Sequence, residues 1–164
     1  MNAMIAPSPE TLAELERTLH AEIPLSRAMG VTVARFDATG LTLRAPLAPN
    51  INHKSTAFGG SLATLATLAG WGLLQLVLRE HAPVTVVIQE SGVQYLRPVA
   101  EDLCAICAMP QAGELEKFLR SLTRRGMARI ELEVLIPADG ETGVQCRGRF
   151  VALDTRRHPH VQPV

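Results

Sequence analysis

The sequence has little of what marks several specialised protein classes. Only three cysteines occur among 164 residues, an odd number that argues against a disulfide framework and for a reducing compartment. Neither sign of charge is in excess, since sixteen Lys and Arg balance sixteen Asp and Glu; this excludes a globally basic nucleic-acid binder and an acidic disordered chain. The first residues show neither the basic segment nor the apolar run of a signal peptide. We therefore expect a cytoplasmic protein that binds no nucleic acid.

Acidic residues are missing from a long central stretch, because no Asp or Glu occurs between Asp37 and Glu80. Within it, residues 58–78 carry no charge and are numerous enough to cross a membrane. The segment also contains paired glycines, serine, threonine and glutamine, without aromatic residues flanking both ends. The amphipathic strands expected on either side need an apolar partner. We therefore interpret residues 59–80 as a buried core helix and expect no association with a membrane.

Hydrophobic periodicity elsewhere predicts an α+β protein. Ser8 and Pro9 are typical of a helix start, and the helix is expected to extend to residue 21. The other predicted elements are strands over 31–36, 41–47, 84–99 (with a bulge near Gly92), 103–109, 128–136 and 144–153, and a helix over 114–125. One antiparallel sheet wrapped around the apolar helix would bury both. The expected organisation is a helical extension over 1–22, one domain over 23–154 and a flexible tail over 155–164.

The loop before the apolar helix has the strongest functional signal. Residues 50–61 read N-I-N-H-K-S-T-A-F-G-G-S. Paired glycines in the first helical turn would let a ligand approach backbone N–H groups that have no partner within the helix. These donors, with the positive end of the helix dipole, would stabilise an oxyanion or hold a carbonyl oxygen. By residue type alone, helix capping and close packing explain the pattern equally well.

This motif, with Gly70-Trp71-Gly72 and Tyr95-Leu96-Arg97-Pro98 after it, resembles the YiiD-type thioesterase domain of the hot-dog fold superfamily. The resemblance covers roughly residues 23–154. It implies an antiparallel sheet around one long buried helix and a homodimer whose sheets join edge to edge, with two sites at the interface; further pairing of dimers is left open. It also implies substrates in which an acyl group forms a thioester with coenzyme A or acyl carrier protein.

The chain differs from many hot-dog thioesterases at the positions that usually supply the acid or base for hydrolysis. Many hot-dog thioesterases have His-Gly-Gly at the helix start and an Asp or Glu about two turns later; this sequence has Phe58 and Thr67 there. Hydrolysis needs a group that takes a proton or attacks the carbonyl, and the helix offers none. Glu90 is the first acid after Glu80 at the helix end. Strand parity places it on the face that covers the helix, whereas a bulge near Gly92 would turn it outward, and both placements stay open.

The expected site combines the loop, the helix start and this carboxylate. The Gly60 N–H is the expected oxyanion donor, and Asn52 is expected to position the acyl carbonyl or carboxylate. Thr56 and Thr67 would hold a water or the acyl oxygen, and Glu90 would be the base in hydrolysis. The further substrate-binding candidates are Asn50, Phe58, Gly59, Ser61, Trp71 and a basic helix face that would attract phosphates or an acidic carrier protein, made of Lys117, Arg120 and Arg124.

No cofactor and no metal site are expected. Cys104 and Cys107 have the spacing of half a zinc knuckle, but residues three apart on a strand point to opposite faces, and no second pair complements them. Both are therefore expected to be packing residues.

Three functions fit these residues. The resemblance favours hydrolysis of an acyl thioester. The residue inventory favours decarboxylation of malonyl-acyl carrier protein to the acetyl form, for fatty acid initiation, because this reaction needs an oxyanion hole but no activated water; decarboxylases of this kind are among the proteins that resemble the family. A non-catalytic sensor of acyl thioesters is the third reading, although no appended domain is expected to pass the signal on.

Overall fold

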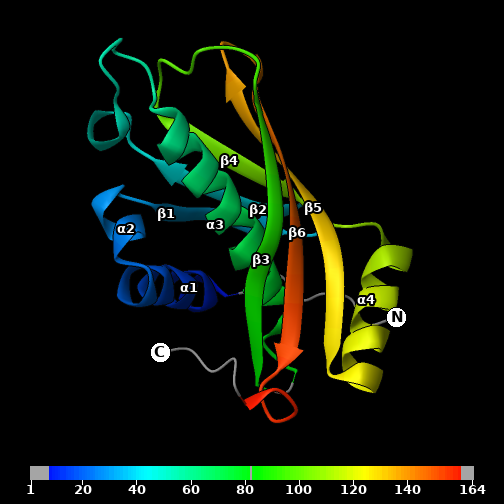
Figure 1. Ribbon diagram of the computed structural model, residues 1–164. Helices are drawn as coiled ribbons and strands as arrows, with labels where there is room; N and C mark the ends of the chain where they lie inside the picture. Colours follow the sequence, from blue (N-terminus) through cyan, green and yellow to red (C-terminus); the bar gives the residue numbers. More distant parts are fainter. Residues whose placement is uncertain (1–7, 82, 160–164) are drawn as a thin grey trace.

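The protein was analysed as a computed structural model that describes residues 8–81 and 83–159 (Figure 1). These residues form an antiparallel six-stranded sheet wrapped around one long helix, which confirms the predicted α+β class. Residues 1–7 of the predicted extension and 160–164 of the predicted tail lie outside the described residues. In chain order the elements are α1 (Pro9–Glu22), α2 (Pro24–Ala28), β1 (Thr32–Asp37), β2 (Gly40–Ala45), the 3₁₀ turn η1 (Ala48–Asn50), α3 (Gly59–Leu78), β3 (Val84–Tyr95), β4 (Leu103–Ala108), α4 (Ala112–Arg125), β5 (Met127–Ala138) and β6 (Glu141–Asp154).

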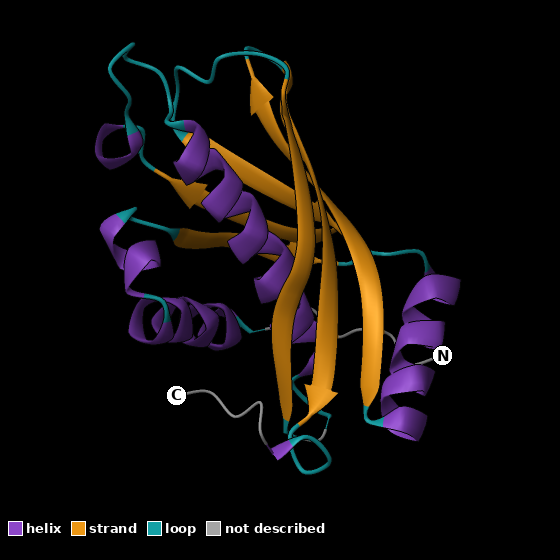
Figure 2. Ribbon diagram, in the orientation of Figure 1, coloured by secondary structure: helices purple, strands orange, loops and turns teal. Residues whose placement is uncertain are grey.

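The strands are ordered β1-β2-β4-β5-β6-β3, so that β1 and β3 are the two edges of the sheet. Figure 2 shows the sheet curving around α3, with α1 and α2 on one side and α4 beside β5. The helix α4 packs its buried Phe118 and Leu122 toward β5 and β6 and ends at Gly126, as predicted. Each pair of neighbouring strands in this order is antiparallel.

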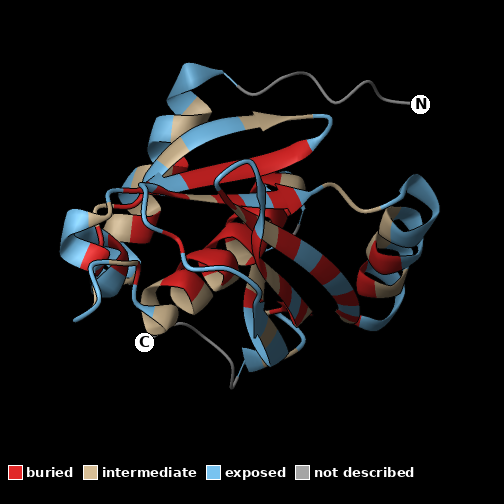
Figure 3. Cartoon of the chain, turned by 90° about the horizontal axis from the view of Figure 1, so that it is seen from above, coloured by how far each residue is buried: buried red, intermediate tan, exposed pale blue. Residues whose placement is uncertain are grey.

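The helix α3 is the core of the domain. It contacts five of the six strands, β2 to β6, and most of its residues are buried (Figure 3). Gly70 allows this close packing, because a Cβ there would lie 2.5 Å from the ring of the buried Phe150. In length and composition α3 could cross a membrane, but 61% of its apolar window is buried inside the protein. It is therefore the core helix that the sequence predicts.

The β5–β6 hairpin alternates buried residues with more exposed ones along β5. Asp139 and Gly140 both have positive φ, at 51° and 79°, as a two-residue hairpin turn of the primed type requires. On the face away from α3, Arg149 pairs with Glu131 at 2.7 Å between Nη2 and Oε1. Arg147 pairs with Glu133 at 3.5 Å. Opposite charges that face each other across two antiparallel strands stabilise the hairpin modestly.

The bulge in β3 lies at Gln89 and not near Gly92, where the sequence predicts it. The register with β6 shifts between Ile88, opposite Phe150, and Glu90, opposite Arg149. One extra residue reverses the parity of a strand. Ile88 therefore shares the α3 side of the sheet with Phe150, and Glu90 lies on the other side. The strand also ends at Tyr95, four residues before the predicted end at 99.

Candidate active site at the start of the core helix

The amino-terminal end of α3 is uncapped. Its N-cap residue is Phe58, whose side chain has no group that could accept a hydrogen bond from the first turn. Among the described residues, no acceptor is recorded for the backbone N–H groups of Gly59, Gly60 and Ser61. Three donors thus lie unpaired at the positive end of a 20-residue helix. This is the arrangement that a carbonyl oxygen or an oxyanion would complete.

Two aromatic rings cover the paired glycines. A Cβ on Gly60 would lie 2.3 Å from Cε1 of Phe58, and a Cβ on Gly59 would lie 3.4 Å from Cε1 of Tyr95. The Tyr95 hydroxyl also donates a hydrogen bond to the Gly59 carbonyl oxygen, at 2.9 Å. The rings are more than half exposed, Phe58 at 57% and Tyr95 at 54%. Tyr95 was absent from the predicted site, since 36 residues separate it from Gly59 and only the sheet brings the two together.

Exposed apolar side chains surround this helix end. We name four of them the apolar rim: Ile51, Phe58, Tyr95 and Leu96, each about half exposed. Ile51 forms an isolated β-bridge with Ala57, the residue before Phe58. Leu96 follows Tyr95, the last residue of β3. Clustered exposed apolar residues of this kind mark binding surfaces more often than they mark ordinary solvent-exposed surface.

Asn52 holds the loop together. Its Nδ2 donates to Thr56 Oγ1 at 2.9 Å and to the Ala57 carbonyl at 3.2 Å. Its Oδ1 accepts from the N–H groups of Lys54, at 2.7 Å, and Thr56, at 3.3 Å. All of these partners are in its own loop, so the predicted contact of Asn52 with an acyl group would require one of these bonds to open. In this structure Asn52 and Thr56 set the shape of the loop that leads into Phe58.

Asn50, a predicted substrate-binding residue, is packed inside the protein. It is 1% exposed, and its Nδ2 donates to the carbonyl oxygens of Met29 and Pro46, both at 2.8 Å. Its backbone carbonyl accepts the Phe58 N–H at 2.7 Å. Its Oδ1 is buried without a hydrogen-bond partner among the described residues, and its role in substrate binding stays a prediction. Asn50 joins the end of α2 to the loop and so fixes where α3 begins.

Thr67 and Trp71 lie farther along α3. The Thr67 hydroxyl donates to the Ala63 carbonyl at 3.0 Å, and the Trp71 indole N–H donates to the Val86 carbonyl at 3.2 Å. At 1.5 Å of rise per residue, Thr67 is about 12 Å and Trp71 about 18 Å along the helix from Gly59. Ser61, by contrast, is in the first turn. The structure thus brings Phe58, Gly59, Gly60 and Ser61 together and leaves Thr67 and Trp71 outside this cluster.

Glu90 is not part of the cluster. Its Oε2 pairs with Arg149 Nη1 at 2.9 Å on the sheet face opposite α3, beside the pair of Arg149 with Glu131. The hydrogen bond that Arg149 donates to Glu131, followed by the charge of Glu90, raises the pKa of the Arg149 guanidinium. The bulge at Gln89 is the reason that strand parity misplaces this carboxylate. Of the two placements left open, the outward one is correct.

The basic residues of α4 are also remote from the cluster. Lys117, Arg120 and Arg124 are exposed on a helix that packs on β5 and β6 and not on the loop. Burial, followed by the nearby Cys146, raises the pKa of the Cys107 thiol to about 12, while Cys104 is partly buried on the opposite face, as strand geometry predicts. Within residues 8–81 and 83–159, no three His, Cys, Asp or Glu side chains gather in a way that could hold a metal ion.

Comparison with known proteins places this geometry in a family context. Residues 12–154 match a family model described as "Putative thioesterase (yiiD_Cterm)". A crystal structure of a protein of unknown function from Chlorobaculum tepidum is 34% identical with a TM-score of 0.87, over 93% of this chain and 99% of that one. A structure described as a putative thioesterase from Shewanella oneidensis is 33% identical with a TM-score of 0.79, over 88% and 98%. A Haemophilus influenzae thioesterase, 18% identical with a TM-score of 0.71 over 92% and 96%, shares the fold.

Proposed function

Because the chain belongs to the putative thioesterase (yiiD_Cterm) family, which has the hot-dog fold, we propose that it hydrolyses acyl thioesters of coenzyme A or acyl carrier protein at the start of α3. The observation that carries the proposal is the set of unpaired N–H donors at Gly59, Gly60 and Ser61, next to the apolar rim. A thioester presents both matching features, a carbonyl oxygen that accepts hydrogen bonds and an apolar acyl group.

In the proposed reaction the thioester carbonyl oxygen accepts hydrogen bonds from the Gly60 and Gly59 N–H groups. Water attacks the carbonyl carbon, the oxygen becomes negative, and the fixed donors and the helix dipole stabilise it. The carbon–sulfur bond then breaks, and the thiol leaves with a proton from the attacking water. Glycine at position 60 lets the carbonyl approach the backbone, provided that the exposed Phe58 ring turns aside.

Decarboxylation of a malonyl thioester is the second candidate, and one observation favours it. The carboxylate expected to activate water, Glu90, is paired with Arg149 on the far side of the sheet. The stretch between Asp37 and Glu80, which contains the loop and α3, has no Asp or Glu at all. Decarboxylation uses the same oxyanion donors for the enolate and needs no activated water. Carbon dioxide leaves, and the α-carbon takes a proton to give the acetyl thioester.

A homodimer is part of the proposal. The edge strand β3 is almost continuously exposed from Val87 to Tyr95. A long exposed edge strand with apolar residues is normally covered, because its free N–H and C=O groups attract another strand. Pairing of β3 with β3 of a second copy would join the two sheets edge to edge.

Mass spectrometry of loaded carrier protein tests the reaction. Malonyl-, acetyl- and octanoyl-acyl carrier protein, and the corresponding coenzyme A thioesters, are incubated with the protein and with a Gly60→Val control. Free carrier thiol from the acetyl or octanoyl form is the expected product, and the control is expected to lose it. Acetyl-carrier protein from the malonyl form would assign decarboxylation instead. If the thioesters bind but stay unchanged, the function that remains is a non-catalytic sensor of acyl thioesters.

A further inference from the structure

Tyr95 binds the same peptide unit that supplies the expected oxyanion donor. The carbonyl of Gly59 and the N–H of Gly60 are the two polar groups of one planar amide. The Tyr95 hydroxyl donates to that carbonyl oxygen at 2.9 Å, within the usual range for such bonds. Its ring lies against Gly59, where a Cβ would be 3.4 Å from Cε1. The hydroxyl therefore contacts one end of an amide whose other end points out of the helix start.

A hydrogen bond at the oxygen of an amide strengthens its N–H as a donor. Accepting the bond draws electron density toward the oxygen through the partial double bond to nitrogen, and the N–H becomes more positive. Helix geometry gives the Gly59 carbonyl the N–H of Ala63 as one partner, and its second lone pair serves Tyr95. Among the described residues, the carbonyls of Phe58 and Gly60 accept no side-chain bond, so the contact distinguishes the Gly60 N–H from its neighbours.

The sheet fixes the backbone around Tyr95. This residue is the last of β3 and pairs with Val144 of β6. The N–H groups of Leu96 and Arg97 both donate to the Gly143 carbonyl, at 2.8 and 3.0 Å. The Tyr95 ring itself is more than half exposed, so burial of apolar surface is a small part of its role. Tyr95 is thus an anchored hydroxyl at the start of α3 and not a residue of the core.

We propose that Tyr95 is a positioning residue for the oxyanion donor, whose hydroxyl holds the Gly59–Gly60 peptide in place and polarises its N–H. The inference rests on the proposed binding of acyl thioesters at the start of α3 and adds a residue that acts on the substrate only through the backbone. The hydroxyl keeps its proton in this role, unlike a general acid. The strengthened N–H stabilises the oxyanion of hydrolysis and the enolate of decarboxylation alike, so the assignment holds for either reaction.

Removing the hydroxyl is expected to have a moderate effect on turnover. Tyr95→Phe keeps a ring against Gly59 and deletes only the donor. One oxyanion donor is worth about 10²–10³ in kcat, and a cooperative bond strengthens another by roughly 10–30%, so kcat on octanoyl-coenzyme A is expected to fall about two- to eightfold. KM is expected to stay close to the wild-type value, because the strengthened bond acts mainly on the charge that develops in the transition state.

The donor strength of Tyr95 can be changed without altering any other residue, because it is the only tyrosine in the chain. Growth on meta-fluorotyrosine replaces this one side chain, and the fluorine makes the hydroxyl a stronger donor. In slightly acidic buffer, where a phenol keeps its proton, kcat is expected to increase in the order Tyr95→Phe, wild type, fluorinated protein. A tyrosine that only joins α3 to β3 would change stability without producing this order. Equal kcat values in the three proteins would overturn the inference.

Nuclear magnetic resonance of the free protein separates this inference from the reaction. The amide nitrogen resonance of Gly60 responds to hydrogen bonding at the preceding carbonyl. Relative to the wild type, it is expected to move upfield in Tyr95→Phe and downfield in the fluorinated protein. These shifts without turnover of any thioester would remove the proposed reaction and leave the polarised peptide standing. Turnover with an unmoved Gly60 resonance would overturn the inference alone. If Tyr95→Phe does not fold, the fluorinated protein still gives both readouts.

Discussion

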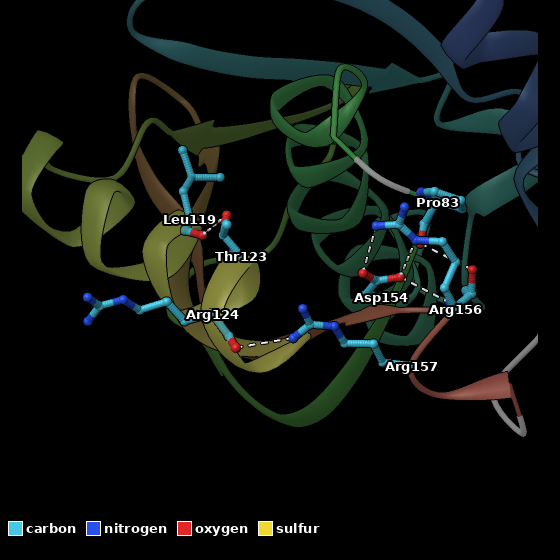
Figure 4. A network of polar contacts seen from close by, with 8 residues as sticks. Pro83, Leu119, Thr123, Arg124, Asp154, Arg156 and Arg157 are labelled. Carbon is cyan, nitrogen blue, oxygen red and sulfur yellow. Dashed lines mark hydrogen bonds and ion pairs between the residues drawn. The ribbon is translucent and has the colours of Figure 1, made fainter.

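The end of α4 and the start of α3 differ in whether the chain itself supplies hydrogen-bond partners for the terminal backbone groups. At the end of α4, Gly126 adopts φ +70° and donates its N–H to Leu122, and Arg157 Nη1 donates to the Arg124 carbonyl at 3.1 Å (Figure 4). At the start of α3, no side chain caps the first turn and exposed rings lie over the glycines. The carbonyl groups at the end of α4 are thus satisfied by the chain itself, whereas the N–H groups at the start of α3 are left to a partner.

We name the end of α4 the closed end and the start of α3 the open end. The difference between them separates residues that stabilise the fold from residues that are available for chemistry. Around the closed end, Asp154 binds Arg156 through both carboxylate oxygens (Figure 4). The backbone N–H of Asp154 donates to the Gly126 carbonyl. The open end has hydrogen-bond donors without acceptors among the described residues. Substitutions at the closed end are therefore expected to change the free energy of unfolding, and substitutions at the open end to change catalysis.

The largest effect is expected from Gly60→Ala. The added Cβ would lie 2.3 Å from the Phe58 ring, which is exposed and free to turn away, so the melting temperature is expected to stay close to that of the wild type. The methyl group would obstruct approach of the thioester to the N–H donors, and kcat/KM is expected to fall by about 100-fold, the scale of losing one oxyanion donor. Steady-state kinetics on octanoyl-coenzyme A and thermal unfolding measure the two quantities.

Two other glycines of α3 are matched controls. Gly59→Ala places its Cβ 3.4 Å from the Tyr95 ring, an ordinary contact, and is expected to cost less than tenfold in kcat/KM on the same octanoyl-coenzyme A assay. Gly70→Ala places it 2.5 Å from the buried Phe150 and is expected to lower the free energy of unfolding by about 1–3 kcal/mol, with activity per folded molecule retained. An active Gly60→Ala variant would remove the assignment of the site.

A smaller effect, on the free energy of unfolding and not on catalysis, is expected from Gly126→Ala at the closed end. Alanine in this left-handed conformation costs about 1–2 kcal/mol, and its Cβ would lie 2.6 Å from Cδ of Arg157. Urea unfolding is expected to show this loss while kcat/KM stays within twofold. Gly113→Ala on the same helix, where a Cβ meets open space, is the control and is expected to be neutral or stabilising. A fall in kcat/KM beyond the loss of folded protein would contradict the separation of the two ends.

The sequence predicts features that depend on neighbours in the chain. The start of α1 after Ser8 and the end of α4 at residue 125 both follow from residue types within a few positions of each other. The bulge at Gln89 does not, because a single extra residue leaves the composition of a strand unchanged and is visible only in the register with β6. The misplaced Glu90 is a direct result.

At the candidate site the same division holds. The uncapped glycine pair could be predicted, since helix starts leave N–H groups unpaired whatever the tertiary structure. Tyr95 could not, because the sheet carries it to Gly59 across 36 residues. Nor could the burial of Asn50, whose partners Met29 and Pro46 directly follow α2 and β2. Two asparagines only two positions apart thus differ in a way that the sequence does not show: Asn50 is buried, and Asn52 shapes the loop.

The smallest effect is expected from the Asp154–Arg156 pair, and it depends on pH. The hydrogen bond from the Arg156 side chain holds the pKa of Asp154 below its usual value of 3.8. A carboxylate with a lowered pKa in the folded state stabilises the protein above the unfolded pKa and loses that contribution as the pH falls through the folded one. Urea unfolding between about pH 5 and pH 2 is therefore expected to show wild type losing its advantage over Asp154→Asn on acidification.

Arg156→Gln is the matched variant for this pair. It removes the guanidinium that lowers the pKa, so it is expected to flatten the same part of the stability profile as Asp154→Asn does. Because Arg156 is largely exposed, the difference at neutral pH is expected to be small. Parallel profiles for the wild type and both variants would show that the pair does not stabilise the closed end, and its closure would then depend on Gly126 and Arg157. A change in kcat/KM at neutral pH in either variant would instead connect this end of the molecule to the site on α3.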